Sequence, residues 1–266
     1  MTPQTSIIIV NWNTRALLLQ CLSSIRTHAA HCEVLVVDNG STDGSHTAVE
    51  HEFPEVKIIR HAENQGYARA NNAGVRAAAG EYLLFLNSDT ILMADTVVGL
   101  SNLLQEHPRP AACSPRLLQQ NGKAQPFAFG GDPTLKYLLA RASARIGFRR
   151  PLHDWDTATL RTVDWVSGAC LLIRRSAFEQ VGGFDENIFM FFEDNDLCLR
   201  LRQAGWNVLY APHVAVMHLG GGSQAGSARR NDYYYRSLQY FYSKHYSAVE
   251  CAILRMLLPI YRLCVR

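Results

Sequence analysis

The sequence lacks several features that would place it in other protein classes. Its seven cysteines are scattered and form no C-x-x-C pair, which argues against a disulfide framework and a zinc site and favours a reducing, cytosolic setting. No apolar stretch reaches the roughly 20 residues of a membrane-spanning helix, and the apolar run 7–10 is too short for a signal peptide. G-x-G-x-x-G and Walker motifs are also absent, so neither a dinucleotide nor a P-loop nucleotide is indicated.

A strong net charge is missing too. The chain carries only +3 over 266 residues, which gives no indication of nucleic-acid binding. The charge is uneven, however: residues 223–266 hold seven Arg or Lys against two acids, a local +5 that leaves the remainder at −2. Hydrophobic residues make up 48% of the chain, enough for a substantial core in one large domain or two small ones.

A short apolar strand that ends on polar residues is the most informative stretch. Residues 83–86 are consecutively apolar, short enough for a strand and apolar enough to be buried on both faces. The run ends at Asn87, Ser88 and Asp89, which places a carboxylate where open α/β sheets bind ligands. That carboxylate could hold a divalent cation. Alternatively, the three residues merely end the strand and cap a helix over 96–105.

Strands and helices alternate along the first part of the chain. Apolar spacing predicts strands over 6–10, 33–37, 56–60 and 83–86, and helices over 17–26, 45–51 and 68–79, the last with Gly80 as its C′ residue. This order predicts a Rossmann-like, mostly parallel sheet flanked by helices.

Polar residues of this half are candidates for holding a nucleotide. Asp38 ends the second strand beside Asn11, and its carboxylate can accept the N3–H of a uracil or thymine ring; it could instead be a turn residue that bonds its own backbone. Arg69, after the loop 64–67, could meet a phosphate or be a solvated surface arginine.

The second half of the chain is less regular. Its predicted elements are strands over 111–118, 163–166, 169–173, 206–210 and 214–217, a loop over 127–131 and a basic helix over 135–146. The weakly patterned segment 119–162 would be a mobile substrate loop or a disordered connector. Gly168 would let a ligand approach the backbone, or only form a bulge. His218, at a strand end, is a candidate metal or phosphate ligand, or a satisfied histidine.

An acidic cluster follows an aromatic run in this half. After the apolar residues 188–192, Glu193, Asp194 and Asp196 open a helix. Acids in a first turn complement the helix dipole, each by roughly 0.3–1 kcal/mol, but three carboxylates within four positions exceed what capping requires. We expect at least one to face a pocket, where a like charge and apolar walls raise its pKa toward that of a general base.

The tail changes composition once more. From Tyr233 aromatic residues interleave with basic ones, and 252–265 is strongly apolar with arginines and Pro259 inside. Residues 233–266 fit an interfacial helix that contacts a membrane surface, with snorkelling arginines and an aromatic belt. A helix packed on the domain's own core and a dimer contact are the alternatives.

Six segments together resemble the inverting glycosyltransferases of family 2, and among them bacterial rhamnosyltransferase-like members. In order they are 6–13 (SIIIVNWN), 36–43 (VVDNGSTD), 64–72 (NQGYARANN), 84–89 (LFLNSD), 165–173 (WVSGACLLI) and 191–201 (FFEDNDLCLRL). The resemblance implies a GT-A fold over 1–232, with a nucleotide-binding half (1–107), an acceptor-binding half (108–232) and a C-terminal helical tail (233–266).

The resemblance also implies residue roles. Asp89 is similar to the last residue of the family's D-x-D motif and is the expected ligand of Mg²⁺ or Mn²⁺, with His218 as a further ligand, whereas Asn87 stands where the motif has its first acid. Asp194 resembles the catalytic base. Asp38 resembles the aspartate that recognises the pyrimidine. The further expected contacts are Asn11, Asn64, Gly66, Arg69 and Asn87 for the donor nucleotide, and Trp165, Gly168 and Glu193 for the acceptor pocket.

The implied reaction moves a sugar, with rhamnose as one candidate, from a UDP- or dTDP-sugar to a glycan or lipid-linked acceptor in cell-surface polysaccharide synthesis. The implied location is the cytoplasm, peripheral on the inner face of the cytoplasmic membrane. A sugar-1-phosphate nucleotidyltransferase is an alternative, although residues 9–15 do not resemble its glycine-rich loop. A non-catalytic, membrane-tethered sugar-nucleotide or glycan-binding protein is another, against which the acids and His218 argue.

Overall fold

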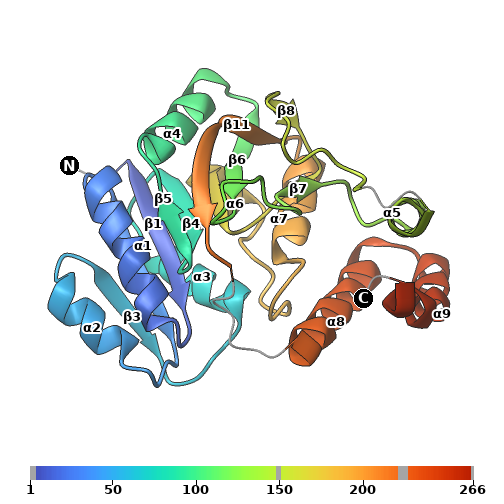
Figure 1. The fold of residues 1–266 in the computed structure, drawn as a ribbon, viewed down its shortest axis with the longest axis horizontal. Helices are drawn as coiled ribbons and strands as arrows, with labels where there is room; N and C mark the ends of the chain where they lie inside the picture. The colour runs from blue at the N-terminus through green and yellow to red at the C-terminus, as the bar shows by residue number, and fades with distance from the viewer. Residues whose placement is uncertain (1–3, 148–150, 221–226, 265–266) are drawn as a thin grey trace.

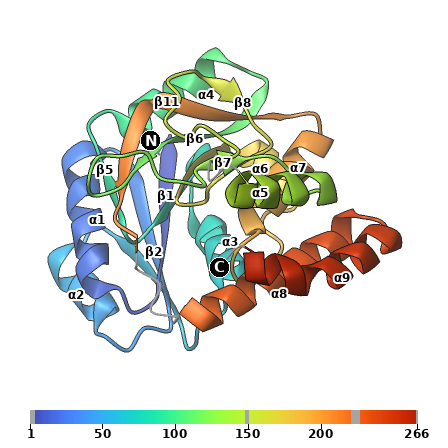
Figure 2. The same ribbon diagram turned by 45° about the vertical axis from the view of Figure 1, so that its right-hand side comes forward.

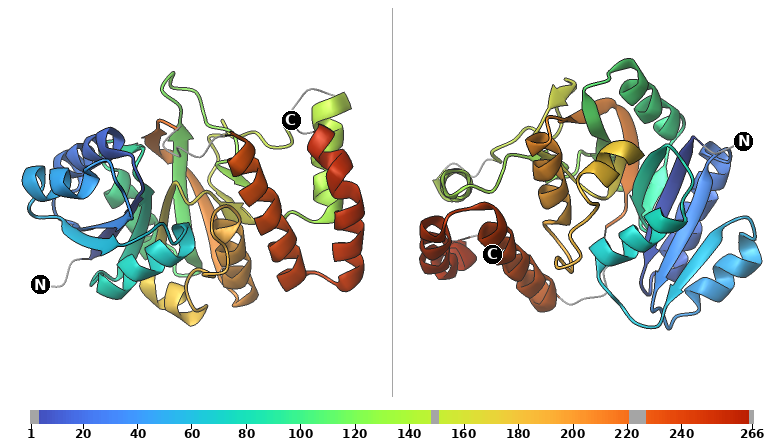
Figure 3. Two further views of the ribbon diagram at one scale, coloured as in Figure 1. Left: turned by 90° about the horizontal axis from the view of Figure 1, so that it is seen from below. Right: turned by 180° about the vertical axis from the view of Figure 1, so that it is seen from behind.

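Apolar strands buried on both faces form the first half of the central sheet. In a computed structural model, which describes residues 4–147, 151–220 and 227–264, β1 (Thr5–Asn11), β2 (Glu33–Asn39), β3 (Lys57–His61) and β4 (Tyr82–Asn87) pair in parallel in the order β3-β2-β1-β4. Helices α1 (Arg15–His28) and α2 (Ser45–Glu52) cover one face, and α3 (Tyr67–Ala77) covers the other (Figures 1 and 3). The predicted parallel α/β arrangement of this half is confirmed.

The second half extends the same sheet with mixed strand directions. β10 (Cys170–Arg174) lies antiparallel between β4 and β6 (Pro110–Leu118), and β11 (Asn207–His218) runs parallel to β6. β5 (Thr90–Leu92) and β8 (Arg161–Thr162) pair antiparallel with β11. The antiparallel entry of β10 matters for the site, because it places the residues before β10 at the carboxyl end of β4.

Two local expectations differ from the structure. Asp89 leads directly into β5, and the N-cap of α4 (Thr96–Glu106) is Asp95, so the alternative in which Asn87, Ser88 and Asp89 cap that helix is wrong. α3 ends in an extended residue, Ala78, and Gly80 is not a left-handed C′ residue. Gly80 instead lies against β1, where a Cβ atom would come within 2.6 Å of the Ser6 nitrogen.

The described parts of the segment 119–162, residues 119–147 and 151–162, contain more regular secondary structure than the pattern predicted. The expected loop 127–131 contains β7 (Phe129–Gly130), which pairs with β9 (Trp165–Val166), and α5 (Leu135–Gly147) forms close to where the basic helix was expected. The two strands expected over 206–217 are one strand, β11, because a register shift between Ala211 and Ala215 accommodates Pro212, which has no N–H to donate. α6 (Arg175–Gln180) was not predicted; its 6 residues are too short to show a helical period.

The tail forms two helices, α8 (Ser227–His245) and α9 (Ala248–Cys264), which lie beside α5 (Figure 2). One face of this pair is packed, in a hydrophobic cluster made of Leu138, Phe192, Leu238, Phe241, Tyr242, Leu254 and Leu258. α9 also exposes Val249 and Met256, at 68% and 69% of their surface. Packing on the domain itself, one of the alternatives for the tail, therefore accounts for one face. Within the described ranges, no helix has both the length and the apolar character that a bilayer crossing requires.

Candidate active site

A cavity of about 590 Å³ opens at the carboxyl ends of β1 and β4 and reaches α5, α7 (Glu193–Gln203) and α8. Asp89 and Asp194 both line it. They share this cavity because β10 is antiparallel to β4: Cys170 pairs with Leu86, so the preceding Gly168 lies beside the end of β4. The Gly168 N–H donates to Asp194 Oδ2 at 3.1 Å. The other predicted site residues that line the cavity are Asn64, Asn87, Trp165, Gly168, Glu193 and His218.

Asp89 and His218 form a carboxylate–imidazole pair in this cavity. The pairing of His218 with Thr90 in the β5–β11 ladder brings them together, and His218 Nε2 lies 3.1 Å from Asp89 Oδ1. On the other side of the ring, Nδ1 lies 2.7 Å from Gln125 Oε1, an oxygen that can only accept a hydrogen bond. When Nδ1 carries the proton and donates it to Gln125, the lone pair on Nε2 points toward the Asp89 carboxylate.

Two facing lone pairs repel, so this arrangement favours a cation between Asp89 and His218. Carboxylate and imidazole are donors that first-row divalent metals accept, and the Gln125 contact is the outer-shell partner that a metal-bound histidine requires. Within the described part of the chain, no group of three or more His, Cys, Asp or Glu could hold a metal. The pair therefore fits a cation that takes its remaining ligands from water and a substrate.

Asp194 is a partly buried carboxylate held by several N–H groups. Besides Gly168, its partners are the backbone N–H of Asn195, at 2.8 Å, and the Asn195 side-chain amide, which donates at 3.1 Å when it is turned to accept from Trp165. Burial raises the pKa of Asp194, and the backbone hydrogen bonds oppose part of that rise. A carboxylate with raised pKa that is held in one orientation at a cavity wall is suited to accept a proton.

Glu193 is the neutral member of this acidic pair. Burial and the neighbouring Asp194 charge raise the pKa of Glu193 to about 8. Its Oε2 is buried without a hydrogen-bond partner, whereas Asp194 accepts from several donors. At neutral pH the proton of the pair therefore resides on Glu193, and Asp194 carries the charge.

Glu193→Gln is expected to stabilise the protein as pH rises. The folded protein holds the Glu193 proton up to about pH 8, whereas the unfolded chain loses it near 4.5, so the free energy of unfolding falls as pH rises through that window. Between these two pH values the Tm of the variant should fall less than the Tm of the wild type. Near pH 8 the variant's Tm should be higher by about 2–4 °C for each 1 kcal/mol of unfolding free energy that the wild type has lost. Thermal unfolding at several pH values tests this, with exposed Glu50→Gln as the control; parallel pH curves for wild type and variant would contradict it.

The predicted donor residues divide into two groups. Asn11 and Asp38 are paired across β1 and β2, and the Asn11 amide lies 3.4 Å from Asp38 Oδ1, but neither residue lines the cavity. Their neighbours Val10, Trp12 and Asn39 do line it. Base recognition by Asp38 therefore stays a prediction for the cavity margin.

The loop before α3 has a clear structural basis. Asn64 Oδ1 accepts from the Gly66 N–H at 3.0 Å and from Asn39 at 2.9 Å. Gly66 has φ +87°, and a Cβ atom there would lie 2.7 Å from the Phe189 carbonyl oxygen. Arg69 does not line the cavity and donates to Glu186 at 3.0 Å, so its contact with a donor phosphate stays a prediction.

Several cavity residues were not among the predicted site residues. Tyr67 donates its hydroxyl proton to the Gly168 carbonyl at 3.0 Å and sits inside a family-like segment, which could have identified it. Gln125 had no such signal, because its contact with His218 joins two segments that are distant in sequence. The same holds for the aromatic and basic residues on the α5 and α8 side, which are Phe127, Tyr137, Arg141 and Tyr234.

Comparisons with known proteins identify relatives along most of the chain. A family model described as glycosyltransferase-like family 2 matches residues 3–234. N-acetylglucosaminyl-diphospho-decaprenol L-rhamnosyltransferase of Mycobacterium tuberculosis is 33% identical over 238 residues, covering 82% of this chain and 76% of the relative. Rhamnosyltransferase WbbL of Escherichia coli is 28% identical over 225 residues, covering 80% of this chain and 82% of the relative.

Solved structures agree on the fold. A mannosyltransferase of Pyrobaculum calidifontis, solved with GDP-Man and Mn²⁺, superposes with a TM-score of 0.64 at 21% identity. It covers 92% of this chain, which spans 64% of the mannosyltransferase. GalNAc-T7, solved with UDP, GalNAc and Mn²⁺, has the same TM-score at 17% identity, with 91% of this chain and 50% of that one covered. The chain belongs to glycosyltransferase family 2, has the GT-A fold, and is similar to bacterial rhamnosyltransferases.

Proposed function

We propose that this glycosyltransferase moves a sugar, with rhamnose as the first candidate, from a UDP- or dTDP-sugar to a hydroxyl of a glycan or lipid-linked acceptor, with inversion at the anomeric carbon. One observation carries the proposal: the closely spaced Asp89 and His218 side chains and the Asp194 carboxylate line the same cavity. The similarity to the two rhamnosyltransferases supports the choice of sugar.

Asp89 and His218 would hold Mg²⁺ or Mn²⁺. The bound cation supplies positive charge that stabilises a departing nucleoside diphosphate. Support comes from the 3.1 Å approach of His218 Nε2 to Asp89 and from the Mn²⁺ in the two solved glycosyltransferases. Asn87 lies beside this pair, with its amide 3.4 Å from His218 Nε2. It stands where the D-x-D motif has its first acid, and it would donate a hydrogen bond there instead of adding a negative charge.

Asp194 takes the proton of the acceptor hydroxyl as that oxygen attacks the anomeric carbon from the face opposite the diphosphate. One displacement inverts the configuration, and no covalent sugar–enzyme intermediate is needed. Gly168 and Asn195 hold the Asp194 carboxylate in place. Because Glu193 is protonated, no second negative charge lies next to that carboxylate. The low dielectric around Asp194 raises its pKa, which makes the carboxylate a stronger base.

The two ends of the cavity differ in character, which favours a division between donor and acceptor. We assign the nucleotide to residues 1–107, with Asp38 and Asn11 at the base ring and Asn64 and Gly66 shaping the adjoining loop. We assign the acceptor to residues 108–232, where Trp165 offers a stacking face. Arg141 on α5, which also lies over the Phe127 ring at 4.7 Å, would face an acceptor phosphate.

The tail, residues 233–266, is proposed to contact the inner face of the cytoplasmic membrane. Val249 and Met256 lie exposed on α9, and the segment is basic. An interfacial helix needs both features, an apolar face and cationic side chains for anionic lipids. Co-sedimentation with anionic vesicles measures this contact, and recovery of the protein in the supernatant would contradict it.

A donor and acceptor screen tests the function directly. UDP- and dTDP-sugars, each with and without Mn²⁺, should raise Tm only when metal is present, since the diphosphate completes the cation's ligands. The donor that shifts Tm is then offered with a polyprenyl-diphosphate-linked sugar and with an alkyl glycoside that lacks the diphosphate. We expect transfer to the first acceptor with an inverted glycosidic bond by NMR. Retention of configuration, or pyrophosphate release from a nucleoside triphosphate and a sugar 1-phosphate, would contradict the proposal.

A further inference from the structure

The backbone immediately before the acidic pair is strained. Phe191 and Phe192 both have left-handed backbone angles, with φ of 64° and 67°, and Phe192 is the N-cap residue of α7. Bulky side chains rarely adopt this conformation, and it persists only where the surrounding structure holds it. Glu193 and Asp194 follow at once, so whatever holds this turn also sets where the proposed base points.

Helix α8 holds the turn. The Ser237 hydroxyl donates to the Met190 carbonyl at 2.8 Å. The ring of Tyr234 packs 5.1 Å from that of Phe192, and the ring of Phe241 packs 5.7 Å from it on the same helix. Phe192 is consequently buried, at 5% exposure. The strained turn is thus covered by residues that come from the tail of the chain.

The same helix also anchors the first turn of α7 through Asp196, which is fully buried. Asp196 Oδ1 lies 2.7 Å from both Lys244 Nζ and His245 Nε2, and its Oδ2 lies 2.6 Å from Arg200. Burial acts to raise the pKa of Asp196, but His245, Arg200 and Lys244 outweigh it, so the pKa is lowered and the group is charged. A buried charge tolerates little displacement from its partners.

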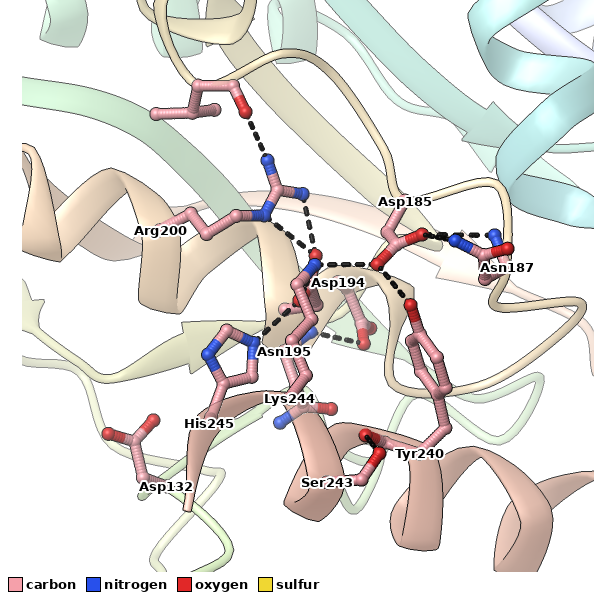
Figure 4. A network of polar contacts seen from close by, with 12 residues as sticks. Asp132, Asp185, Asn187, Asp194, Asn195, Arg200, Tyr240, Ser243, Lys244 and His245 are labelled. Carbon is pink, nitrogen blue, oxygen red and sulfur yellow. Dashed lines mark hydrogen bonds and ion pairs between the residues drawn. The ribbon is translucent and has the colours of Figure 1, made fainter. Parts of the chain in front are cut away.

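Lys244 ties in the loop that leads to the turn as well. Its ammonium lies 2.6 Å from Asp185, to which Tyr240 also donates at 3.0 Å (Figure 4). α8 therefore contacts the chain on both sides of Asp194: the loop and strained turn before it, and Asp196 after it.

We infer that α8 is a positioning element for the proposed base, with Lys244 and His245 acting through Asp196 and Tyr234 and Phe241 acting through Phe192. The inference rests on the proposed role of Asp194. Lys244, His245 and Phe241 do not line the cavity, and Tyr234 reaches it from α8. In this scheme all four act by fixing the direction in which the Asp194 carboxylate faces the acceptor hydroxyl. The first tail helix then belongs functionally to the catalytic domain, and a boundary at residue 232 cuts through it.

His245→Ala in the full chain tests this. It leaves the Asp196 charge with fewer partners, so the first turn of α7 can shift. We expect kcat to fall about tenfold or more, because misplacement of a base by an ångström can cost up to about 100-fold, while KM for the nucleotide sugar and calorimetric Kd for the nucleoside diphosphate stay unchanged. His245→Gln, which keeps an N–H donor near the Nε2 position, should recover most of kcat.

Arg236→Ala is the matched control on the same helix, since Arg236 is exposed and pairs only at the surface with Asp232 among the contacts described. It should leave kcat unchanged. Lys244→Met, which keeps the His245–Asp196 bond, carries the test if His245→Ala does not fold. Any of three results would overturn the inference. They are equal kcat in His245→Ala and Arg236→Ala, loss of donor binding in parallel with kcat, and no recovery of kcat in His245→Gln. Asp194→Asn, measured alongside, separates the cases: if it stays active, the proposed function fails; if it is inactive, only the positioning role does.

Discussion

Asp194→Asn is expected to lower kcat for sugar transfer by about 10²–10⁴-fold, the usual contribution of a general base. Asparagine has nearly the same shape and keeps an oxygen for the Gly168 N–H, but it cannot take a proton. Nucleoside diphosphate binding should be unaffected, because the proposed donor contacts are made by other residues, in 1–107. Turnover with a nucleotide sugar and acceptor, together with calorimetry of the diphosphate, measures both quantities.

The pH dependence provides a second reading of the same variant. Since burial raises the pKa of Asp194, wild-type kcat should fall as pH drops through that raised value and the base becomes protonated. The small residual rate of Asp194→Asn should lack this acidic limb. Asp232→Asn, an exposed acid on α8, serves as the control and should behave as wild type. A variant at position 194 that keeps most of its activity would show that another group deprotonates the acceptor.

Asp89→Ala is expected to weaken metal-dependent nucleotide binding by at least about tenfold, since even outer-shell changes at metal sites cost about 10–100-fold in affinity. Removing the carboxylate leaves His218 Nε2 as a lone neutral donor. Calorimetric titration of UDP and dTDP with and without Mn²⁺ measures the loss, which should appear only when metal is present. Unchanged affinity with metal present would count against the assigned cation site.

Two histidines on β11 form a matched pair for this experiment. His218→Ala should reproduce much of the Asp89→Ala effect, whereas His213→Ala, on the same strand but exposed, should not. Gln125→Ala should give a smaller loss, because Gln125 only orients the His218 ring through Nδ1. Equal losses in both histidine variants would mean that the effect comes from the strand and not from a ligand.

Local patterns were sufficient for much of the fold. The runs 6–10, 33–37 and 83–86 form strands that are buried because helices cover both faces of the sheet, as such short, mainly apolar stretches require. The helices between them follow from apolar residues at 3.6-residue spacing. Polar residues at the ends of these strands then fall at one edge of the sheet. For the same reason Asp89 could be singled out before its geometry was known, whereas Asp194 stood out as one of three acids in the first turn of a predicted helix.

What these patterns left open depends on contacts between distant segments. The antiparallel entry of β10 brings Gly168 to Asp194, and a strand between Asp89 and α4 brings His218 to Asp89, yet neither pairing has a local signature. Gln125 pairs with His218, and α8 covers Phe192. Both contacts likewise depend on how segments that are distant in the sequence pack together. Residue types and spacing decided which groups are available for chemistry, whereas the tertiary structure decided which of them meet, because burial and strand register act across the whole chain at once.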